Sequence, residues 1–309
     1  MLLQLVRRLL IAVPTLLAVI ASAFLLMHSA KGGPFDRERQ LPPEIEQRLL
    51  AAYNLDKPLG DQLGLYLADL ARGDLGPSMA YKDKDVIDII AEGFPTSATL
   101  GVCAVTLALL IGGALGVAAA LGRNRPQDYL VMALALAGVC LPALVMGPLF
   151  KLVFGEWLQW LPSVGLARDR LSFAHLILPV VTLALPQIAI VSRLMRASMI
   201  EAMRSNAIRT ARAKGLPEAQ IIWRHALPVA VLPIVSYLGP ALAGVLTGSF
   251  VIETVFGLPG IGRQFITGAL TRDYTVVMGV VIVYSALIIL FNIAVDFIYG
   301  ALDPRARAT

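Results

Sequence analysis

Six long runs of apolar residues constrain this chain more than any other feature of its sequence. Each run holds about 20 residues, enough for an α-helix to cross the hydrocarbon core of a bilayer. Hydrophobic residues make up 57% of the 309 residues and charged residues 15%, whereas soluble domains average about 25% charged residues. The pattern predicts an all-α membrane protein with six transmembrane helices near residues 9–28, 97–121, 129–151, 174–193, 227–251 and 275–300.

The first apolar run follows Arg7 and Arg8 and could be mistaken for a secretory signal. It is too long for the apolar part of a signal peptide, lacks a convincing small-x-small cleavage site and precedes further spans. We therefore expect this run to be retained as a membrane helix.

Basic residues are divided unevenly between the short connections. Thirteen Lys and Arg residues fall on one side of the predicted spans and five on the other, leaving out the long segment 29–96. Because cytoplasmic connections carry the excess of Lys and Arg, both termini are expected to be cytoplasmic. The net charge of +5 reflects these topology signals, and without interleaved aromatic residues it predicts no nucleic-acid partner.

The segment 29–96 differs in kind from the rest of the chain, because acidic and basic residues and turn signals such as Gly32-Gly33-Pro34 interrupt it. Short amphipathic patterns predict helices within it near 44–53, 62–70 and 86–90. The sequence therefore divides into a cytoplasmic N-terminus with the first helix (1–28), an extracytoplasmic helical subdomain (29–96), a five-helix core (97–300) with a cytoplasmic loop at 194–226, and a cytoplasmic tail (301–309).

Proline and glycine are frequent within the predicted spans. Proline frees a backbone carbonyl, so it either bends helices around a cavity or reflects the ordinary composition of membrane helices. Small residues at close-packing spacing predict that the second span approaches a neighbour closely. The prolines are Pro142, Pro148, Pro179, Pro186, Pro233 and Pro240, and the small residues are Gly112, Gly113, Gly116 and Ala120.

Residues that could carry out chemistry are scarce. No G-x-x-x-x-G-K-[ST] loop is present, so nothing in the chain could hold the phosphates of ATP. The three histidines are far apart in sequence, and Cys103 and Cys140 lie in apolar runs without neighbours at metal-ligand spacing. We expect no catalytic residue, no metal and no cofactor.

The cytoplasmic loop carries the most specific pattern. A helix is predicted from Arg196 through Lys214 without interruption, and Gly215 with Pro217 predicts its end. A second helix is predicted from Glu218 to Ala226, leading into the fifth span. Small residues keep the tip of the first helix narrow enough to enter a groove on another protein.

The residues from Thr210 to Gly215, followed by Pro228, resemble the EAA loop of permease subunits of ATP-binding-cassette (ABC) importers. Arg209 and Thr210 stand where that family has Glu and Ala, a departure typical of its peptide and nickel branch. Other motifs are similar to the same branch, and two of them, 76–83 and Gly239-Pro240, most resemble the B-type subunits of oligopeptide permeases. The further motifs are Asn54–Leu59, Gly73–Ser78, Phe94–Thr96, Val251–Thr254, Gly257–Gly262, Arg272–Tyr274 and Asp296–Arg305.

This resemblance implies the type I ABC importer permease fold in a bacterial inner membrane. It also implies the partners: a second, C-type permease subunit, two ATPase subunits, an extracytoplasmic peptide-binding protein, membrane lipid and a peptide substrate. The loop would dock into a cleft on an ATPase subunit and transmit its motion to the bundle. The residues carried over for this coupling role are Arg209, Thr210, Ala211, Arg212, Ala213, Lys214 and Gly215.

Polar residues in the fifth and sixth spans are candidates for a water-lined path, although such side chains also bond their own helix. The candidates are Ser236, Tyr237, Thr247, Ser249, Tyr284, Ser285 and Asn292.

Three other functions remain open on the sequence. The same machine could carry dipeptides, nickel or another small solute. An ion-coupled secondary transporter would need a carboxylate in the middle of a span, and only Asp296 comes near that, about one turn from the end of the last span. A passive scaffold would not need the narrow-tipped loop.

Overall fold

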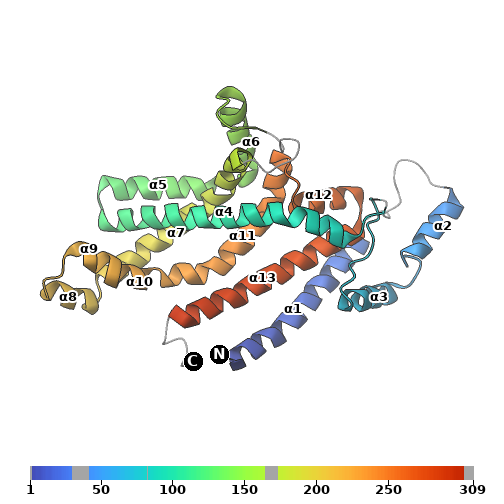
Figure 1. Ribbon diagram of the computed structural model, residues 1–309, viewed down its shortest axis with the longest axis horizontal. Helices are drawn as coiled ribbons and strands as arrows, with labels where there is room; N and C mark the ends of the chain where they lie inside the picture. Colours follow the sequence, from blue (N-terminus) through green and yellow to red (C-terminus); the bar gives the residue numbers. More distant parts are fainter. Residues whose placement is uncertain (1, 30–41, 82, 164–172, 303–309) are drawn as a thin grey trace. The chain divides into compact units, whose positions relative to one another are not determined.

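The computed structural model describes residues 2–29, 42–81, 83–163 and 173–302, and these residues form helices and connecting turns (Figure 1). No strand occurs among them apart from an isolated bridge between Pro77 and Asp85. The elements are α1 (Leu2–Ser29), α2 (Pro43–Ala52), α3 (Leu59–Ala71), α4 (Val86–Leu121), α5 (Pro126–Cys140), α6 (Ala143–Phe150), the π-helix η1 (Lys151–Trp157), α7 (Phe173–Met203), α8 (Asn206–Ala213), α9 (Glu218–Ile221), the π-helix η2 (Ile222–Ala226), α10 (Leu227–Ala230), α11 (Leu232–Phe256), α12 (Ile261–Thr271) and α13 (Tyr274–Leu302).

Five helices are long and apolar enough to cross a membrane: α1, α4, α7, α11 and α13. They contain the predicted spans 1, 2, 4 and 6 and most of span 5, which begins in α10. A sixth crossing is available if the bent pair of α5 with α6 and η1 forms one span. The structure therefore has five candidate spans among the described residues, or six if the bent pair crosses as one, which confirms the predicted multi-span helical fold.

The third predicted span, residues 129–151, is not the single helix that the sequence suggested. It is broken between Cys140 and Ala143, where the chain bends by 100°. Pro142 has no N–H to donate and disfavours the helical conformation at the residue before it, and Leu141 is extended, with φ −90° and ψ 113°. Among the described residues, Pro179, Pro186 and Pro240 lie inside helices that continue past them.

The chain forms two compact units, each with its own interior. The first unit comprises the described parts of Ala98–Leu258 and Ile288–Thr309, and the second comprises those of Leu2–Ser97 and Pro259–Leu287. The helices α4 and α13 each contribute residues to both units.

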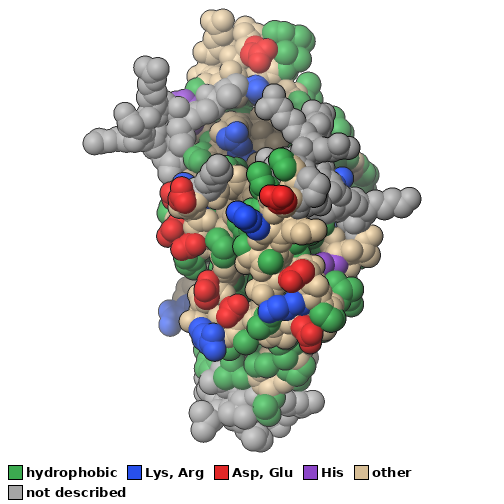
Figure 2. Space-filling model, turned by 90° about the vertical axis from the view of Figure 1, so that its right-hand side faces the viewer, with side chains coloured by type: hydrophobic (Ala, Val, Ile, Leu, Met, Phe, Trp, Pro, Cys, Tyr) green, Lys and Arg blue, Asp and Glu red, His purple; other side chains and the backbone are tan. Residues whose placement is uncertain are grey.

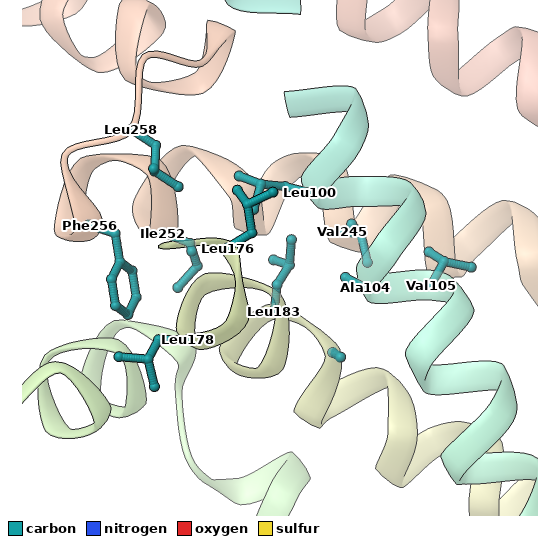
Figure 3. Close-up of a cluster of buried hydrophobic side chains, with 11 residues drawn as sticks. Leu100, Ala104, Val105, Leu176, Leu178, Leu183, Val245, Ile252, Phe256 and Leu258 are labelled. Atoms are coloured by element: carbon teal, nitrogen blue, oxygen red, sulfur yellow. The ribbon is translucent and has the colours of Figure 1, made fainter. Parts of the chain in front are cut away.

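Helix α7 is central to the first unit, where it contacts α5, α6, α10 and α11. A buried apolar cluster joins residues of α4, α7 and α11 (Figure 3), including Leu100, Leu183 and Val245. Lipid tails are as apolar as these side chains, so helices that cross a membrane associate through close van der Waals packing. Where α4 meets α7, a Cβ atom on Gly116 would lie 2.5 Å from Met195 Cβ, and one on Gly112 would lie 2.8 Å from the Ile188 carbonyl oxygen. The close approach predicted from small residues is confirmed.

The second unit is organised around Asp273, which is fully buried at the start of α13. Its carboxylate accepts hydrogen bonds from the hydroxyl of Ser78, at 2.5 Å, and from the backbone N–H groups of Ala80 and Val276. Thr275 donates to the carbonyl of Pro77. These bonds hold the irregular segment 76–80 against the first turn of a helix nearly 200 residues away.

The described part of the predicted subdomain 29–96 contains the helices α2 and α3, close to two of the three patterns seen in the sequence. The third pattern, 86–90, is instead the first part of α4, and residues 30–41 lie outside the described part. The Tyr53 hydroxyl donates to the Ser78 carbonyl at 3.1 Å, which ties the end of α2 to the segment around Asp273. On the face shown in Figure 2, acidic and basic side chains are interspersed.

Candidate functional site

The loop that follows α7 begins with an interruption that the sequence did not predict. Helix α7 ends at Met203, and α8 begins at Asn206 after a turn at Arg204 and Ser205. Ser205 is extended, with φ −65° and ψ 155°, and precedes α8 as its N-cap residue. The uninterrupted helix predicted from Arg196 to Lys214 is therefore wrong, because the chain leaves the helical conformation at Ser205 and a new helix starts after it.

One face of α8 fastens the loop to the first unit. Ile208 and Ala211 are buried, whereas their neighbours on α8 are exposed. They join an apolar cluster with Met199 and Ala202 of α7 and with residues of the returning helices α9 to α10. Spacing of three residues places both side chains on one side of the helix. A displacement of α8 would therefore press on α7 through a packed interior.

The end of α8 has the geometry of a Schellman motif. Gly215 adopts a left-handed conformation with φ +75°, the Gly215 N–H donates to the Arg212 carbonyl at 2.9 Å, and the Leu216 N–H donates to the Ala211 carbonyl at 3.3 Å. Glycine is favoured there because other residues have a Cβ atom that opposes positive φ. The helix stop predicted at Gly215 is confirmed.

The opposite face of α8 and its tip are open to solvent in this chain. Arg212 pairs with Glu218 at the start of α9, with 2.7 Å between Nε and Oε1. This hydrogen bond raises the pKa of the Arg212 guanidinium and lowers the pKa of the Glu218 carboxyl, and both groups are fully exposed. The exposed members of the predicted coupling set are Arg209, Thr210, Arg212, Ala213, Lys214 and Gly215, and Ala211 is the buried one.

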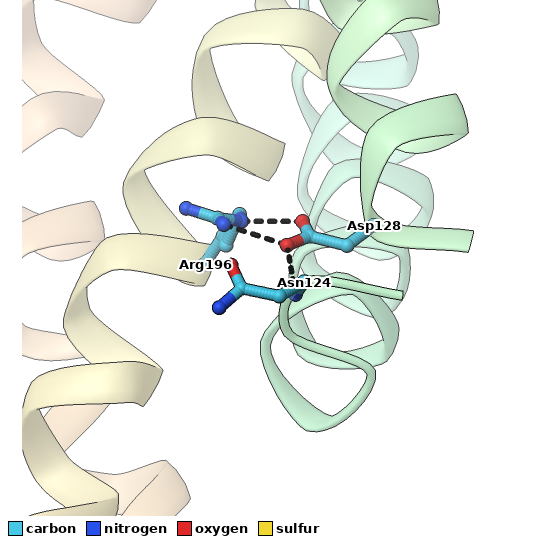
Figure 4. Close-up of polar contacts among 3 residues, drawn as sticks. All are labelled: Asn124, Asp128 and Arg196. Carbon is cyan, nitrogen blue, oxygen red and sulfur yellow. Dashed lines mark hydrogen bonds and ion pairs between the residues drawn. The ribbon is translucent and has the colours of Figure 1, made fainter. Parts of the chain in front are cut away.

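A part-buried ion pair that we did not predict lies on α7, seven residues before its end. The Arg196 side chain donates to the carboxylate of Asp128 on α5 from Nε, at 2.5 Å, and from a terminal nitrogen, at 2.7 Å (Figure 4). The backbone N–H of Asn124 donates to the same carboxylate at 2.9 Å. In the sequence analysis, Arg196 served only as one of the basic residues that indicate the cytoplasmic side. The feature that could have indicated an ion pair is Asp128, a single carboxylate at the start of an apolar helix.

The candidate path residues are divided between the two units. Ser236, Tyr237, Thr247, Ser249 and Asn292 lie in the first unit, and Tyr284 and Ser285 lie in the second. Most of them bond a carbonyl one turn back in their own helix, as Thr247, Ser249 and Asn292 do. The Tyr237 hydroxyl instead donates to Gln187 on α7 at 2.8 Å. These bonds are the behaviour expected of polar residues in membrane helices.

The acidic side chains of the long helices are confined to the helix ends. Among the described residues of α4, α5 to η1, α7, α11 and α13, every Asp or Glu lies within about two turns of an end of its helix. They are Asp88, Glu92, Asp128, Glu156, Glu201, Glu253 and Asp296. A coupling ion bound at the middle of a span would need a carboxylate farther from the ends, so this distribution argues against an ion-coupled transporter. The described residues also include no group of three His, Cys, Asp or Glu that could hold a metal ion.

The fold defines a class of protein. A chain of the MetNI methionine ABC transporter, in a structure of its inward-facing conformations, matches 70% of this chain and 97% of its own length, with a TM-score of 0.60 and 19% identity. A chain of an amino acid ABC transporter matches 71% of this chain and 94% of its own length, with a TM-score of 0.52. The architecture is therefore that of the type I ABC importer permeases.

The sequence comparisons give the particular family. Residues 112–308 match the model of the binding-protein-dependent transport system inner membrane component, and the chain belongs to this family. The oligopeptide transport system permease protein OppB of Salmonella typhimurium is 50% identical over 97% of this chain and 98% of its own length. The dipeptide transport system permease protein DppB of Bacillus subtilis is 40% identical over 95% of this chain and 94% of its own length.

Proposed function

We propose that this chain is a pore-forming permease subunit of an importer that carries oligopeptides into the cytoplasm at the expense of ATP hydrolysed by partner subunits. The 50% identity to an oligopeptide permease over nearly the whole of both chains supports the cargo. Membership of a family of inner membrane components supports the location. Because the sequence has no phosphate-binding loop, the energy must come from other proteins.

The observation that carries the coupling role is the division of α8 into two faces. Its buried face packs on α7, and its exposed face with the tip at Gly215 is free to contact another protein. ATP-driven closure elsewhere can shift this bundle only through a contact that differs between two states. We assign that contact to Arg209–Gly215, docked in a cleft of one of two ATPase subunits.

The remaining partners follow from the same family membership. A C-type permease subunit completes the pore, and an extracytoplasmic binding protein delivers the peptide. The excess of Lys and Arg in the connections that include 122–125 and 204–226 supports a cytoplasmic location for both termini. The segment 42–81 then lies outside the cytoplasm, where it borders the surface for the binding protein.

A water-lined path along the fifth and sixth spans would use the hydroxyl and amide groups of the seven candidate residues. A path that accepts varied peptides contacts mainly the backbone of its cargo, so few side chains need to be specific. Ser236, Thr247 and Asn292, which are exposed on this chain, are the stronger candidates.

Reconstitution tests the proposal. The chain, its C-type partner and both ATPase subunits are placed in proteoliposomes with the binding protein and tritiated trialanine. We expect accumulation that requires ATP hydrolysis. Accumulation driven by an ion gradient without ATP would disprove the function. Dialanine that competes with trialanine at equal concentration would favour the dipeptide alternative, which the 40% identity to a dipeptide permease motivates.

Substitution of Gly215 tests the docking contact separately. A Cβ atom at Gly215 would meet no atom of this chain within 4 Å, so within the chain a side chain there causes only the strain of the positive φ, and its bulk acts on a partner. Gly215→Trp should abolish trialanine uptake while the chain still inserts and folds. Gly215→Asn is the matched control, because asparagine tolerates a left-handed conformation and adds little bulk. Normal uptake by the Trp variant would remove the coupling role from the α8 tip.

A further inference from the structure

The ion pair between Asp128 and Arg196 joins two helices that otherwise meet through apolar contacts. Asp128 is 2% exposed, and the Arg196 side chain reaches it with two hydrogen bonds. Elsewhere along this contact, a Cβ atom on Gly138 of α5 would lie 3.3 Å from the Ala189 side chain of α7. Among the described residues, the side-chain hydrogen bonds between α5 and α7 are the two of this pair.

Such an ion pair fixes the relative position of two helices more closely than apolar packing does. A planar guanidinium that binds a carboxylate through two nitrogens sets both the distance and the orientation of its partner. The Asn124 N–H also binds the Asp128 carboxylate, so Arg196 holds the turn between α4 and α5 as well as α5 itself. Apolar side chains can slide by one another at less cost, since their contacts have no direction.

The pair lies on a continuous line of contacts that begins at α8. The cluster of Ile208 and Ala211 with Met199 and Ala202 joins α8 to α7. Arg196, on the same helix as Met199, then joins α7 to α5. Beyond α5, the chain bends at Leu141 into α6, which packs on both α7 and α11.

We propose that Asp128 and Arg196 form a register clamp, by which we mean an ion pair that obliges α5 to move with α7 when α8 is displaced. They are positioning residues for the transport cycle and contact neither ATP nor peptide. The proposal rests on the coupling role proposed for α8. It assigns the transmission of that motion to a single charged contact between two membrane helices.

Two variants separate the clamp from simple structural support. Asp128→Asn keeps an oxygen that can accept from the Asn124 N–H but ends the charged pairing. The double variant Asp128→Asn with Arg196→Gln removes both charges, so that no unpaired charge remains to destabilise the fold. The controls are Lys84→Gln and Glu92→Gln, which end an exposed ion pair in the second unit.

The measurement is the amount of trialanine imported per ATP hydrolysed, per assembled complex in proteoliposomes. We expect this ratio to fall about threefold or more in both Asp128 variants, as for changes along a coupling network, and to be unchanged in the controls. If the double variant regains the wild-type ratio together with normal assembly, the pair only supports the fold and the clamp is disproved. A wild-type complex that imports no trialanine would instead overturn the proposed function.

Spin labels test the clamp directly. Labels at Leu134 on α5 and Glu201 on α7, both exposed, are placed in a chain whose two cysteines are replaced by alanine. The wild-type distance between the labels should be the same with and without ATP, because the two helices move together. In the double variant, ATP should shift or broaden the distance distribution. A shift in the wild type, or none in the double variant, would disprove the clamp.

Discussion

The surroundings of α7 and those of Asp273 show two ways of holding segments together. Around α7, helices meet through glycine residues and apolar clusters, and one part-buried ion pair adds a directional contact. Around Asp273, a stretch without regular structure is held by two hydrogen bonds to one carboxylate, donated by Ser78 and Ala80. Helices form their backbone hydrogen bonds internally and need only a neighbour of complementary shape. An irregular segment needs hydrogen-bond partners for its N–H groups from elsewhere in the chain. The first arrangement can repack during a transport cycle, and the second favours one geometry.

Removing the carboxylate at Asp273 should have the largest effect on stability. Asp273→Ala leaves two buried donors, the Ser78 hydroxyl and the Val276 N–H, without their acceptor and weakens the hold on Ala80, which should cost about 3–5 kcal/mol. The midpoint of thermal unfolding in detergent, followed by size-exclusion chromatography after heating, measures the loss. The exposed Asp85→Ala serves as the control. Equal midpoints for the two variants would contradict a central role of Asp273 in the second unit.

Adding one methyl group between α4 and α7 should have the next largest effect. Gly116→Ala places a Cβ atom 2.6 Å from the Ser192 carbonyl oxygen, so the helices must separate, at a cost of about 1–3 kcal/mol. Gly113→Ala is the matched control on the same helix, because its Cβ atom would meet Met195 at an ordinary 3.8 Å. The same unfolding measurement should lower the midpoint for Gly116→Ala alone. An unchanged midpoint would show that the packing of α4 on α7 adapts freely.

Loss of a single hydrogen bond in the second unit should have a smaller effect. The Ser97 hydroxyl accepts from the backbone N–H of Ile261 at 2.9 Å, and both residues are buried. Ser97→Ala should cost about 1 kcal/mol, and Ser97→Thr should restore most of it. A loss as large as that of Asp273→Ala would mean that stability is spread evenly over the polar contacts of this unit.

The exposed pair on the loop should contribute least. Glu218→Gln ends the pairing with Arg212, but solvent screens both groups, so no change in the unfolding midpoint is expected near neutral pH. Because Arg212 lowers the pKa of Glu218 in the folded chain, any stabilisation is present above the ordinary pKa of glutamate and is lost as the pH falls through the lowered pKa. The measurement compares the unfolding midpoints of the wild type and Glu218→Gln between pH 8 and about pH 3. A wild-type advantage that grows as the pH falls would contradict this prediction.

The sequence predicted the helices better than the contacts between them. Apolar runs and the stop at Gly215 report local preferences, so the spans and the end of α8 follow from them. The break at Leu141 was visible only as Pro142, one proline among several, and Pro179 in α7 breaks nothing. The presence of a proline therefore did not tell which helix would be broken.

The polar contacts escaped prediction because they join residues far apart in sequence. Asp128 and Arg196 are separated by 68 positions, and Ser78 and Asp273 by 195. The motifs around Gly73–Ser78 and Arg272–Tyr274 were both noticed, yet nothing in either segment says that the other is its partner. The role of such a residue becomes clear only when folding brings its partner to it.

The bend at Leu141 also decides which side of the membrane the C-terminus reaches. Five crossings would leave the two ends of the chain on opposite sides, and six bring them to the same side. If both termini lie in the cytoplasm, as we propose, α5 must cross the bilayer together with α6 and η1, although the chain turns by 100° between them. If the pair instead entered and left by one surface, every connection after residue 157 would change sides, and the α8 loop would face away from any ATPase.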